Sequence, residues 1–366
     1  MIPAVYIGGT GQHAGKTLIA TGMVGALRER GLDARYIKPM GQRETDLCGE
    51  PVDDDAALLS RVYGWALPPK ALSPVTMPSG FTERAITGQV TTEELTQRIQ
   101  EAYGQVSAGA DLVMVEGTGH AGVGSVVGLG NADVARLLQA RAVLVTGGGV
   151  GRPIDDFSLN ACAYHARDVP IAGVICNKIQ PAKSDKVVPL LRRWFQAHQV
   201  PLLGCIPYDR ALTLITLQQV AEGISADVLF GDDCLGMHVS QCVVGATTAH
   251  RMLEHLQAGV LAIIPGDRED LIMAAISARR ATQRHAGQGV AICLTGDVQP
   301  HDYILKLVRD AGLPVLVSHL GTFRTASAID DLVAKTMPAD TEKIGLATRL
   351  VAQHVNLDEL LPQVMR

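Results

Sequence analysis

A glycine-rich segment near the N-terminus carries side chains that together could bind phosphate. Residues 9–17 read Gly-Thr-Gly-Gln-His-Ala-Gly-Lys-Thr, between an apolar run at 4–7 and a helical pattern at 18–30. Glycines let backbone N–H groups turn toward phosphate oxygens, and a helix N-terminus adds unpaired donors. In such a loop the lysine reaches the β- and γ-phosphates and the hydroxyl holds Mg²⁺. We therefore predict an ATP- and Mg²⁺-binding loop whose contacts come from Gly11, Gln12, His13, Ala14, Gly15, Lys16 and Thr17.

The spacing of this loop differs from the usual pattern, in which four residues separate the first glycine from Gly-Lys-Ser/Thr. Here five residues separate Gly9 from Gly15. The alternative interpretation is a glycine-rich strand-to-helix turn without a ligand, but the flanking patterns and later acidic residues favour the phosphate loop. ATPases of the ParA/MinD type carry a second lysine early in the loop. Gly11 occupies that position here, which argues against a filament or positioning ATPase.

A second lysine and an acidic run follow. Lys38 ends a strand pattern at 33–38, where it could stabilise phosphate charge or simply be solvated. Residues 53–55 are all aspartate and precede a helical pattern at 56–63. One aspartate at a helix start is often only a cap, but three exceed that need. We therefore predict Asp55 as a Mg²⁺ ligand, with Asp54 as the alternative.

A buried strand that ends in an acid is the third element of the predicted site. Residues 111–117 read Asp-Leu-Val-Met-Val-Glu-Gly, which is typical of a Walker B strand. Glu116 would then coordinate Mg²⁺ or order its water shell. The glycine-rich loop at 117–124 could place backbone donors on an anionic substrate, and His120 in it is either a ligand contact or a solvent-facing side chain. Residues 71–90 read as an irregular loop, either over the site or with no role.

The remaining patterns predict two α/β domains. Strand patterns at 141–147, 171–177 and 202–206 alternate with helical ones, which indicates a P-loop NTPase parallel sheet with helices on both faces. Asn177 ends one of these strands, where its amide could read a base edge. The alternation of strand and helix patterns is interrupted near residues 224–238, and a smaller α/β pattern follows. We therefore expect a nucleotide-binding domain at 1–228, a second domain at 229–340 and a helical tail at 341–366.

Composition excludes several classes of function. The formal net charge is −5, and no basic stripe indicates a nucleic-acid partner. No apolar run approaches the roughly 18 residues of a membrane span, and no signal peptide is apparent. The seven cysteines are scattered without metal-ligand spacing. We therefore expect a cytoplasmic protein with no membrane partner.

With these residues in view, residues 1 to about 225 resemble the dethiobiotin synthetase and cobyrinic acid a,c-diamide synthase group of P-loop proteins. The resemblance rests on the five-residue loop gap, Lys38-Pro39, Asp55-Ala56, Glu116-Gly117 and Asn177, in that order. It implies that Lys16 and Thr17 bind phosphate and Mg²⁺, and that Asp55 and Glu116 bind Mg²⁺. It further implies that Lys16 and Lys38 are the catalytic lysines and that Asn177 contacts adenine.

Residues about 230–335 resemble the DRTGG domain, through Gly245-Ala246, Gly266-Asp267-Arg268 and Leu294-Thr295-Gly296. Asp297 stands where that domain's motif has its second glycine. The two domains in this order are similar to the N-terminal half of long bacterial phosphate acetyltransferases. We expect neither an acetyltransferase domain nor a glutaminase domain within these 366 residues.

Two functions remain open at this point. The first is a regulatory module that binds Mg-ATP, senses a small metabolite and passes its state to a separate metabolic enzyme. The alternative is an ATP-dependent ligase that phosphorylates a carboxylate or carbamate, as the synthetases do. Because those synthetases place substrate at a subunit interface, the resemblance also implies a homodimer or larger homo-oligomer.

Overall fold

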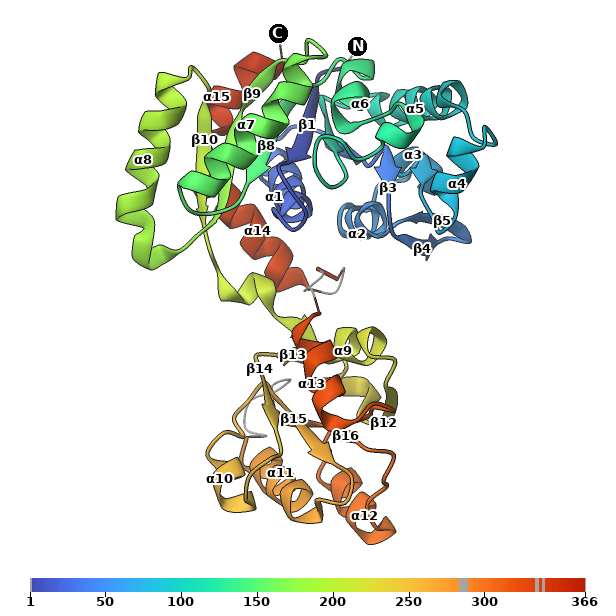
Figure 1. The fold of residues 1–366 in the computed structure, drawn as a ribbon, viewed down its shortest axis with the longest axis vertical. Helices are drawn as coiled ribbons and strands as arrows, with labels where there is room; N and C mark the ends of the chain where they lie inside the picture. Colours follow the sequence, from blue (N-terminus) through green and yellow to red (C-terminus); the bar gives the residue numbers. More distant parts are fainter. Residues whose placement is uncertain (1, 283–288, 333–335, 338–339, 366) are drawn as a thin grey trace. The chain divides into compact units, whose positions relative to one another are not determined.

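The computed structural model describes residues 2–282, 289–332, 336–337 and 340–365 (Figure 1). The chain packs as two units. The first consists of Met1–Asp209 together with Thr336–Arg366, and the second of Arg210–Lys335. The second unit is therefore an insertion in the sequence of the first.

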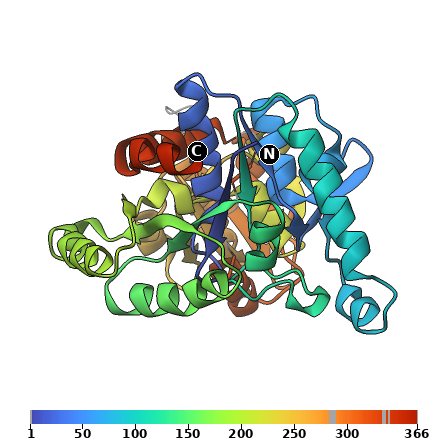
Figure 2. The same cartoon turned by 90° about the horizontal axis from the view of Figure 1, so that it is seen from above.

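The first unit is built on a six-stranded sheet in which every pairing is parallel, in the order β10-β9-β8-β1-β7-β2. Its strands are β1 Ala4–Gly9, β2 Ala34–Ile37, β7 Leu112–Glu116, β8 Arg141–Thr146, β9 Ile171–Ile179 and β10 Leu202–Pro207. Most of these residues are apolar and buried, as expected of strands covered on both faces. Figure 2 shows α1 and α14 over one face and α7 over the other. The predicted P-loop architecture is confirmed.

Helices of the first unit connect these strands or cover the sheet. They are α1 Lys16–Glu29, α2 Asp54–Tyr63, α3 Pro69–Leu72, α4 Phe81–Ile86, α5 Thr92–Ser107, α6 Asn131–Leu137, α7 Gly151–His165, α8 Ser184–Ala197, α14 Thr341–His354 and α15 Leu357–Val364. Short 3₁₀ turns add Ser125–Val127 and Pro181–Lys183 here, and Arg210–Thr213 and Asp232–Cys234 in the second unit.

The segment between β2 and β7 is more ordered than the sequence predicted. A two-stranded pair joins β3 Met40–Gly41 to β6 Val75–Thr76, and a hairpin joins β4 Glu44–Leu47 to β5 Glu50–Asp53. The expected irregular loop at 71–90 therefore contains β6 and α4. Short strands rich in charged residues give no alternating apolar pattern, so the hairpin was not foreseen.

The second unit has a five-stranded sheet in the order β12-β17-β16-β15-β14. Only β12 runs antiparallel, against β17. The strands are β12 Asp227–Phe230, β14 Gln241–Val244, β15 Val260–Pro265, β16 Ala291–Thr295 and β17 Val315–Val317, with β11 Ile215–Thr216 and β13 His238–Val239 forming a separate pair. The helices are α9 Leu217–Gly223, α10 Ala249–Leu253, α11 Glu269–Thr282, α12 Asp302–Asp310 and α13 Thr322–Asp330. The predicted smaller α/β domain is confirmed.

The boundary between the units differs from the one expected at 228/229. Residues 210–228 include α9, which packs in the second unit, and the start of β12, which is hydrogen-bonded into the second sheet. The tail returns to the first unit, because α14 packs along α1. Two glycines allow this close approach. A Cβ at Gly22 would lie 2.5 Å from the carbonyl oxygen of Ala347, and one at Gly25 would lie 2.4 Å from Thr348 Oγ1.

Among the described residues, no helix is both long and apolar enough to cross a membrane.

The contact between α1 and α14 generates a testable prediction with a matched control. Alanine is a better helix former than glycine by up to about 1 kcal/mol, so Gly104→Ala on α5, where a Cβ meets nothing within 4 Å, should stabilise the protein. Gly22→Ala should instead destabilise it, because the new methyl meets a backbone carbonyl that cannot rotate away. Urea unfolding of the two variants measures the difference. Equal stabilisation of both would contradict the packing of α14 on α1.

Candidate functional site

The predicted site residues converge where three neighbouring strands end. In the sheet order β1-β7-β2, the loop after β1 carries Lys16, β7 ends at Glu116, and Lys38 follows β2. Because parallel strands present their carboxyl ends at one edge, residues more than 70 positions apart in the sequence meet there. This edge is the place where open α/β sheets bind ligands.

The loop between β1 and α1 is held in place by two side chains near the end of β9. Asn177 Nδ2 donates to the carbonyl oxygen of Ala14 at 3.0 Å, and Lys178 Nζ donates to that of His13 at 2.8 Å. His13 and Gly15 have φ values of 60° and 93°, in the left-handed region. A Cβ at Gly15 would lie 2.2 Å from Asn177 Nδ2, so the close approach of the asparagine also requires glycine there.

Both polar atoms of the Asn177 side chain contact the backbone, one in the phosphate loop and one at the end of β9. Its Oδ1 accepts from the backbone N–H of Lys178 at 2.9 Å, and its side chain is buried. In the structure these contacts brace the loop, and the adenine contact implied by the resemblance stays a prediction. Lys178 was not predicted, because its contact with the loop depends on how the chain folds and not on a pattern in the sequence.

Lys16 is buried and folds back over the start of its own loop. Its Nζ donates to the carbonyl oxygen of Gly119 at 3.1 Å, and a Cβ on Gly9 would lie 2.7 Å from that nitrogen. Burial lowers the pKa of Lys16 from its ordinary value. Within the described part of the chain no carboxylate pairs with it, so this ammonium is placed to receive an anion.

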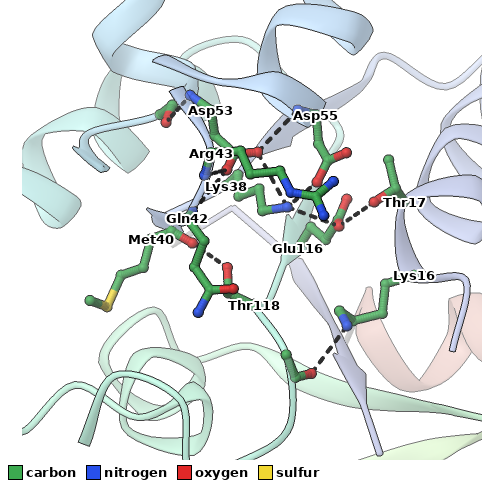
Figure 3. A network of polar contacts seen from close by, with 12 residues as sticks. Lys16, Thr17, Lys38, Met40, Gln42, Arg43, Asp53, Asp55, Glu116 and Thr118 are labelled. Atoms are coloured by element: carbon green, nitrogen blue, oxygen red, sulfur yellow. Dashed lines mark hydrogen bonds and ion pairs between the residues drawn. The ribbon is translucent and has the colours of Figure 1, made fainter. Parts of the chain in front are cut away.

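A buried cluster centred on Lys38 is the main electrostatic feature of the site (Figure 3). Lys38 Nζ lies 3.3 Å from Asp53 Oδ1 and 3.3 Å from Glu116 Oε1, and it also pairs with Asp55 Oδ2. Burial alone would lower the pKa of Lys38. The charges of Asp55, Glu116 and Asp53 outweigh burial and hold that pKa well above its ordinary value. Lys38 is therefore a fixed cation.

Glu116 connects the lysine cluster to the phosphate loop. Its Oε1 accepts from Thr17 Oγ1 at 2.7 Å, and its Oε2 accepts from Tyr36 OH at 2.8 Å. The residue is only 1% exposed, and burial raises the pKa of its carboxyl group. Thr17, Glu116 and Lys38 thus form one continuous network, while Tyr36, which faces inward from β2, was not foreseen.

The acidic run divides its roles among neighbouring residues. Asp53 caps α2 by accepting from the N–H of Asp55 at 3.0 Å, and the same Oδ1 faces Lys38. Burial raises the pKa of Asp53. Burial would raise the pKa of Asp55 too, but its contact with Lys38 and hydrogen bonds lower it. Sequence reasoning chose Asp55, with Asp54 as the alternative, and missed Asp53, whose cap position also faces the lysine.

The donor set fits a divalent cation that is bound partly by phosphate. Three carboxylates surround one ammonium in the Lys38 cluster, which leaves a surplus of negative charge when all are ionised. Mg²⁺ is typically held by one or two carboxylates together with water and substrate phosphates. Among the described residues no group of three or more His, Cys, Asp or Glu side chains could hold a metal alone. Such a site needs only a few protein ligands, and Asp55, Glu116 and the Thr17 hydroxyl can supply them.

The loop after β7 adjoins this network without contributing a charge. Asn131 braces it, donating to the carbonyl oxygen of Thr118 at 2.7 Å, and Asn131 Oδ1 accepts from Tyr6 OH at 2.7 Å. His120 is exposed and accepts from the N–H of Gly122 at 3.2 Å, which matches the solvent-facing alternative. A cavity of about 10 Å³ beside Glu116 and Thr118 has room for roughly one water molecule.

Comparison with known proteins agrees with this architecture. The AAA domain family matches residues 3–216, and the DRTGG domain matches residues 219–332. The phosphate acetyltransferase of Pseudomonas putida is 30% identical over 96% of this chain and 50% of its own length. That of Pseudomonas aeruginosa is 29% identical over 97% of this chain and 51% of its own. The chain thus spans about half the length of the curated relatives it matches.

Among solved structures, the MinC:MinD cell division protein complex of Aquifex aeolicus gives a TM-score of 0.37 at 14% identity, covering 57% of this chain and 83% of that one. The expected P-loop domain followed by a DRTGG domain is confirmed by the family matches, as is the similarity to phosphate acetyltransferases. Since the AAA domain match covers well over half of the 366 residues, the chain belongs to the AAA domain family, and a DRTGG domain follows that domain in its sequence.

Proposed function

We propose that the first unit binds Mg-ATP and that the protein acts as a metabolite-sensing regulatory module related to part of the phosphate acetyltransferases. The observation that carries this proposal is the buried cluster of Lys38 with Asp53, Asp55 and Glu116. The cluster supplies a surplus of carboxylate oxygens beside the phosphate loop. In the same cluster, Lys38 pairs with protein carboxylates.

Each residue has a definite task in this proposal. Lys16 and the loop at residues 11–17 would hold the phosphates, with Lys16 turning from the carbonyl of Gly119 to the incoming anion. Thr17, Asp55 and Glu116 would hold Mg²⁺. Bound Mg²⁺ would supply positive charge that offsets the β- and γ-phosphates. Asn177 and Lys178 would keep the loop in shape for these contacts.

The second candidate is an ATP-dependent ligase of the dethiobiotin synthetase kind. It is favoured by two buried lysines, Lys16 and Lys38, which follow different strands at the same edge of the sheet. Such an enzyme needs Lys38 to stabilise charge that develops on a transferring phosphoryl group. We favour the regulatory role, because a DRTGG domain follows the AAA domain in a chain that is similar to phosphate acetyltransferases.

The first test concerns Lys16. Lys16→Ala should abolish Mg²⁺-dependent ATP binding, because it deletes the buried charge that faces the phosphates. Isothermal titration calorimetry of the full chain with Mg-ATP measures the effect. Lys186→Ala, an exposed lysine on α8, is the control and should bind like wild type. Equal ATP affinity in wild type and Lys16→Ala would overturn the proposed binding site.

The second test concerns Lys38 and separates sensor from ligase. In a sensor, Lys38→Ala should change ATP affinity, while ATP hydrolysis stays slow in both proteins. In a ligase, it should lower turnover on the order of 10²–10³-fold with a smaller change in binding. The measurement is ATP affinity beside hydrolysis, with and without small carboxylates and bicarbonate.

Removing Lys38 also leaves the buried carboxylates of Asp53 and Glu116 without their cation, and breaking a buried pair typically costs about 3–5 kcal/mol of stability. Circular dichroism of Lys38→Ala must therefore show a folded protein before its affinity is interpreted. Wild-type protein with rapid, substrate-stimulated turnover that collapses in the variant would overturn the regulatory role.

The expected homodimer stays a prediction. Two-fold dimers are the commonest soluble oligomers, and the resembling synthetases use one to build their substrate sites. Multi-angle light scattering at micromolar concentration should give about twice the chain mass of 38.8 kDa. A single-chain mass would contradict it.

A further inference from the structure

Arg43 lies in the loop between β3 and β4, and its backbone is fixed by a carboxylate of the Lys38 cluster. Asp53 Oδ2 accepts from the N–H of Gln42 at 3.1 Å and from that of Arg43 at 3.4 Å. The carbonyl oxygen of Arg43 accepts from the N–H of Asp54 at 3.2 Å. Since Asp53 Oδ1 faces Lys38, one buried side chain positions both the lysine and the arginine.

The close approach of this loop depends on a glycine. A Cβ at Gly41 would lie 2.4 Å from Asp53 Oδ2 and 2.4 Å from Asp53 Cβ. Any larger residue at position 41 would push the chain away from Asp53 and break the two N–H contacts. The local chain is therefore shaped to present residues 42 and 43 beside the cluster.

The Arg43 side chain extends toward the site and has no protein partner there. Figure 3 shows it running from its loop toward Asp55 and Glu116. The residue is exposed, and within the described ranges its guanidinium makes no hydrogen bond or ion pair.

The charges around the site indicate which group Arg43 would meet. The Lys38 cluster carries three carboxylates and one ammonium, so its net charge is −2 when all are ionised. One Mg²⁺ balances that charge. The charges of Lys16 and Arg43 then remain, and they match the roughly −2 charge of a terminal phosphate near neutral pH. The terminal phosphate of a nucleoside diphosphate carries a similar charge, so a preference for the triphosphate depends on position, because only a third phosphate would extend beyond Lys16 toward Arg43.

We propose that Arg43 contacts the γ-phosphate of bound ATP and makes the site prefer nucleoside triphosphates over diphosphates. This inference rests on the proposed Mg-ATP binding of the first unit. A guanidinium presents paired N–H donors that match phosphate oxygens, which a lysine at the same position cannot reproduce. Asp53 accepts a hydrogen bond from the Arg43 backbone and also faces Lys38, so the same side chain positions both residues for contact with the terminal phosphate.

The experiment compares ATP and ADP affinity in four proteins of 366 residues, the wild type and three variants, by calorimetry in the presence of Mg²⁺. Arg43→Ala should weaken ATP binding roughly 10- to 100-fold, the usual effect of losing one charged hydrogen-bonded contact. Its ADP affinity should stay within about twofold of wild type. The ATP affinity of Arg43→Lys should lie between those of wild type and Arg43→Ala. Arg193→Ala, which changes an exposed arginine on α8, should match wild type for both nucleotides.

The outcomes separate this inference from the function on which it rests. Wild-type protein that binds neither nucleotide would overturn the proposed function and this inference together. Wild-type protein that binds ATP, beside an Arg43→Ala variant with an unchanged ratio of ATP to ADP affinity, would overturn the inference alone. An equal loss for both nucleotides belongs to that second case, because it would show that Arg43 only maintains the loop.

Discussion

The burial of Lys38 among Asp53, Asp55 and Glu116 is the constraint on which the rest of the first unit depends. Removing the ionised groups of Lys38, Asp53 and Glu116 from water is costly, and the cluster is tolerated only when its geometry and remaining hydrogen bonds are satisfied. Tyr36 and Thr17 donate to Glu116, while backbone N–H groups donate to Asp53. The strand ends, the start of α2 and the loop after β3 must therefore hold their positions together.

Strand order makes this arrangement possible. Because β7 lies between β1 and β2, Glu116 stands between the phosphate loop on one side and Lys38 on the other. Asp53 and Asp55 contact the lysine from outside the sheet, at the point where the β4–β5 hairpin leads into α2. The hairpin thus closes the cluster, and it carries the only part of the acidic run that is fully buried.

Sequence patterns were sufficient for the parts of the site that are local. The phosphate loop, Lys38, Asp55 and Glu116 each stand at the end of a recognisable strand or start of a helix, so their convergence followed from the parallel sheet. Asp53 and Arg43 could not be assigned, because their roles depend on a hairpin without apolar alternation. The bracing role of Asn177 depends on the distance between two loops, which no spacing in the sequence encodes. The boundary at residue 210 was missed because α9 is a short amphipathic helix that would suit either unit.

The path of the chain bears on the regulatory role. The chain leaves the first unit after β10, forms the whole second unit, and returns as α14. α14 packs on α1, the helix that begins at Lys16, through contacts so close that Gly22 and Gly25 have no room for a side chain. A sensor needs a connection between the unit that receives a signal and the site that responds. In the sequence, the second unit lies between β10 and α14, and α14 packs on the helix that begins at Lys16, so the order of the elements is compatible with the proposed regulatory module.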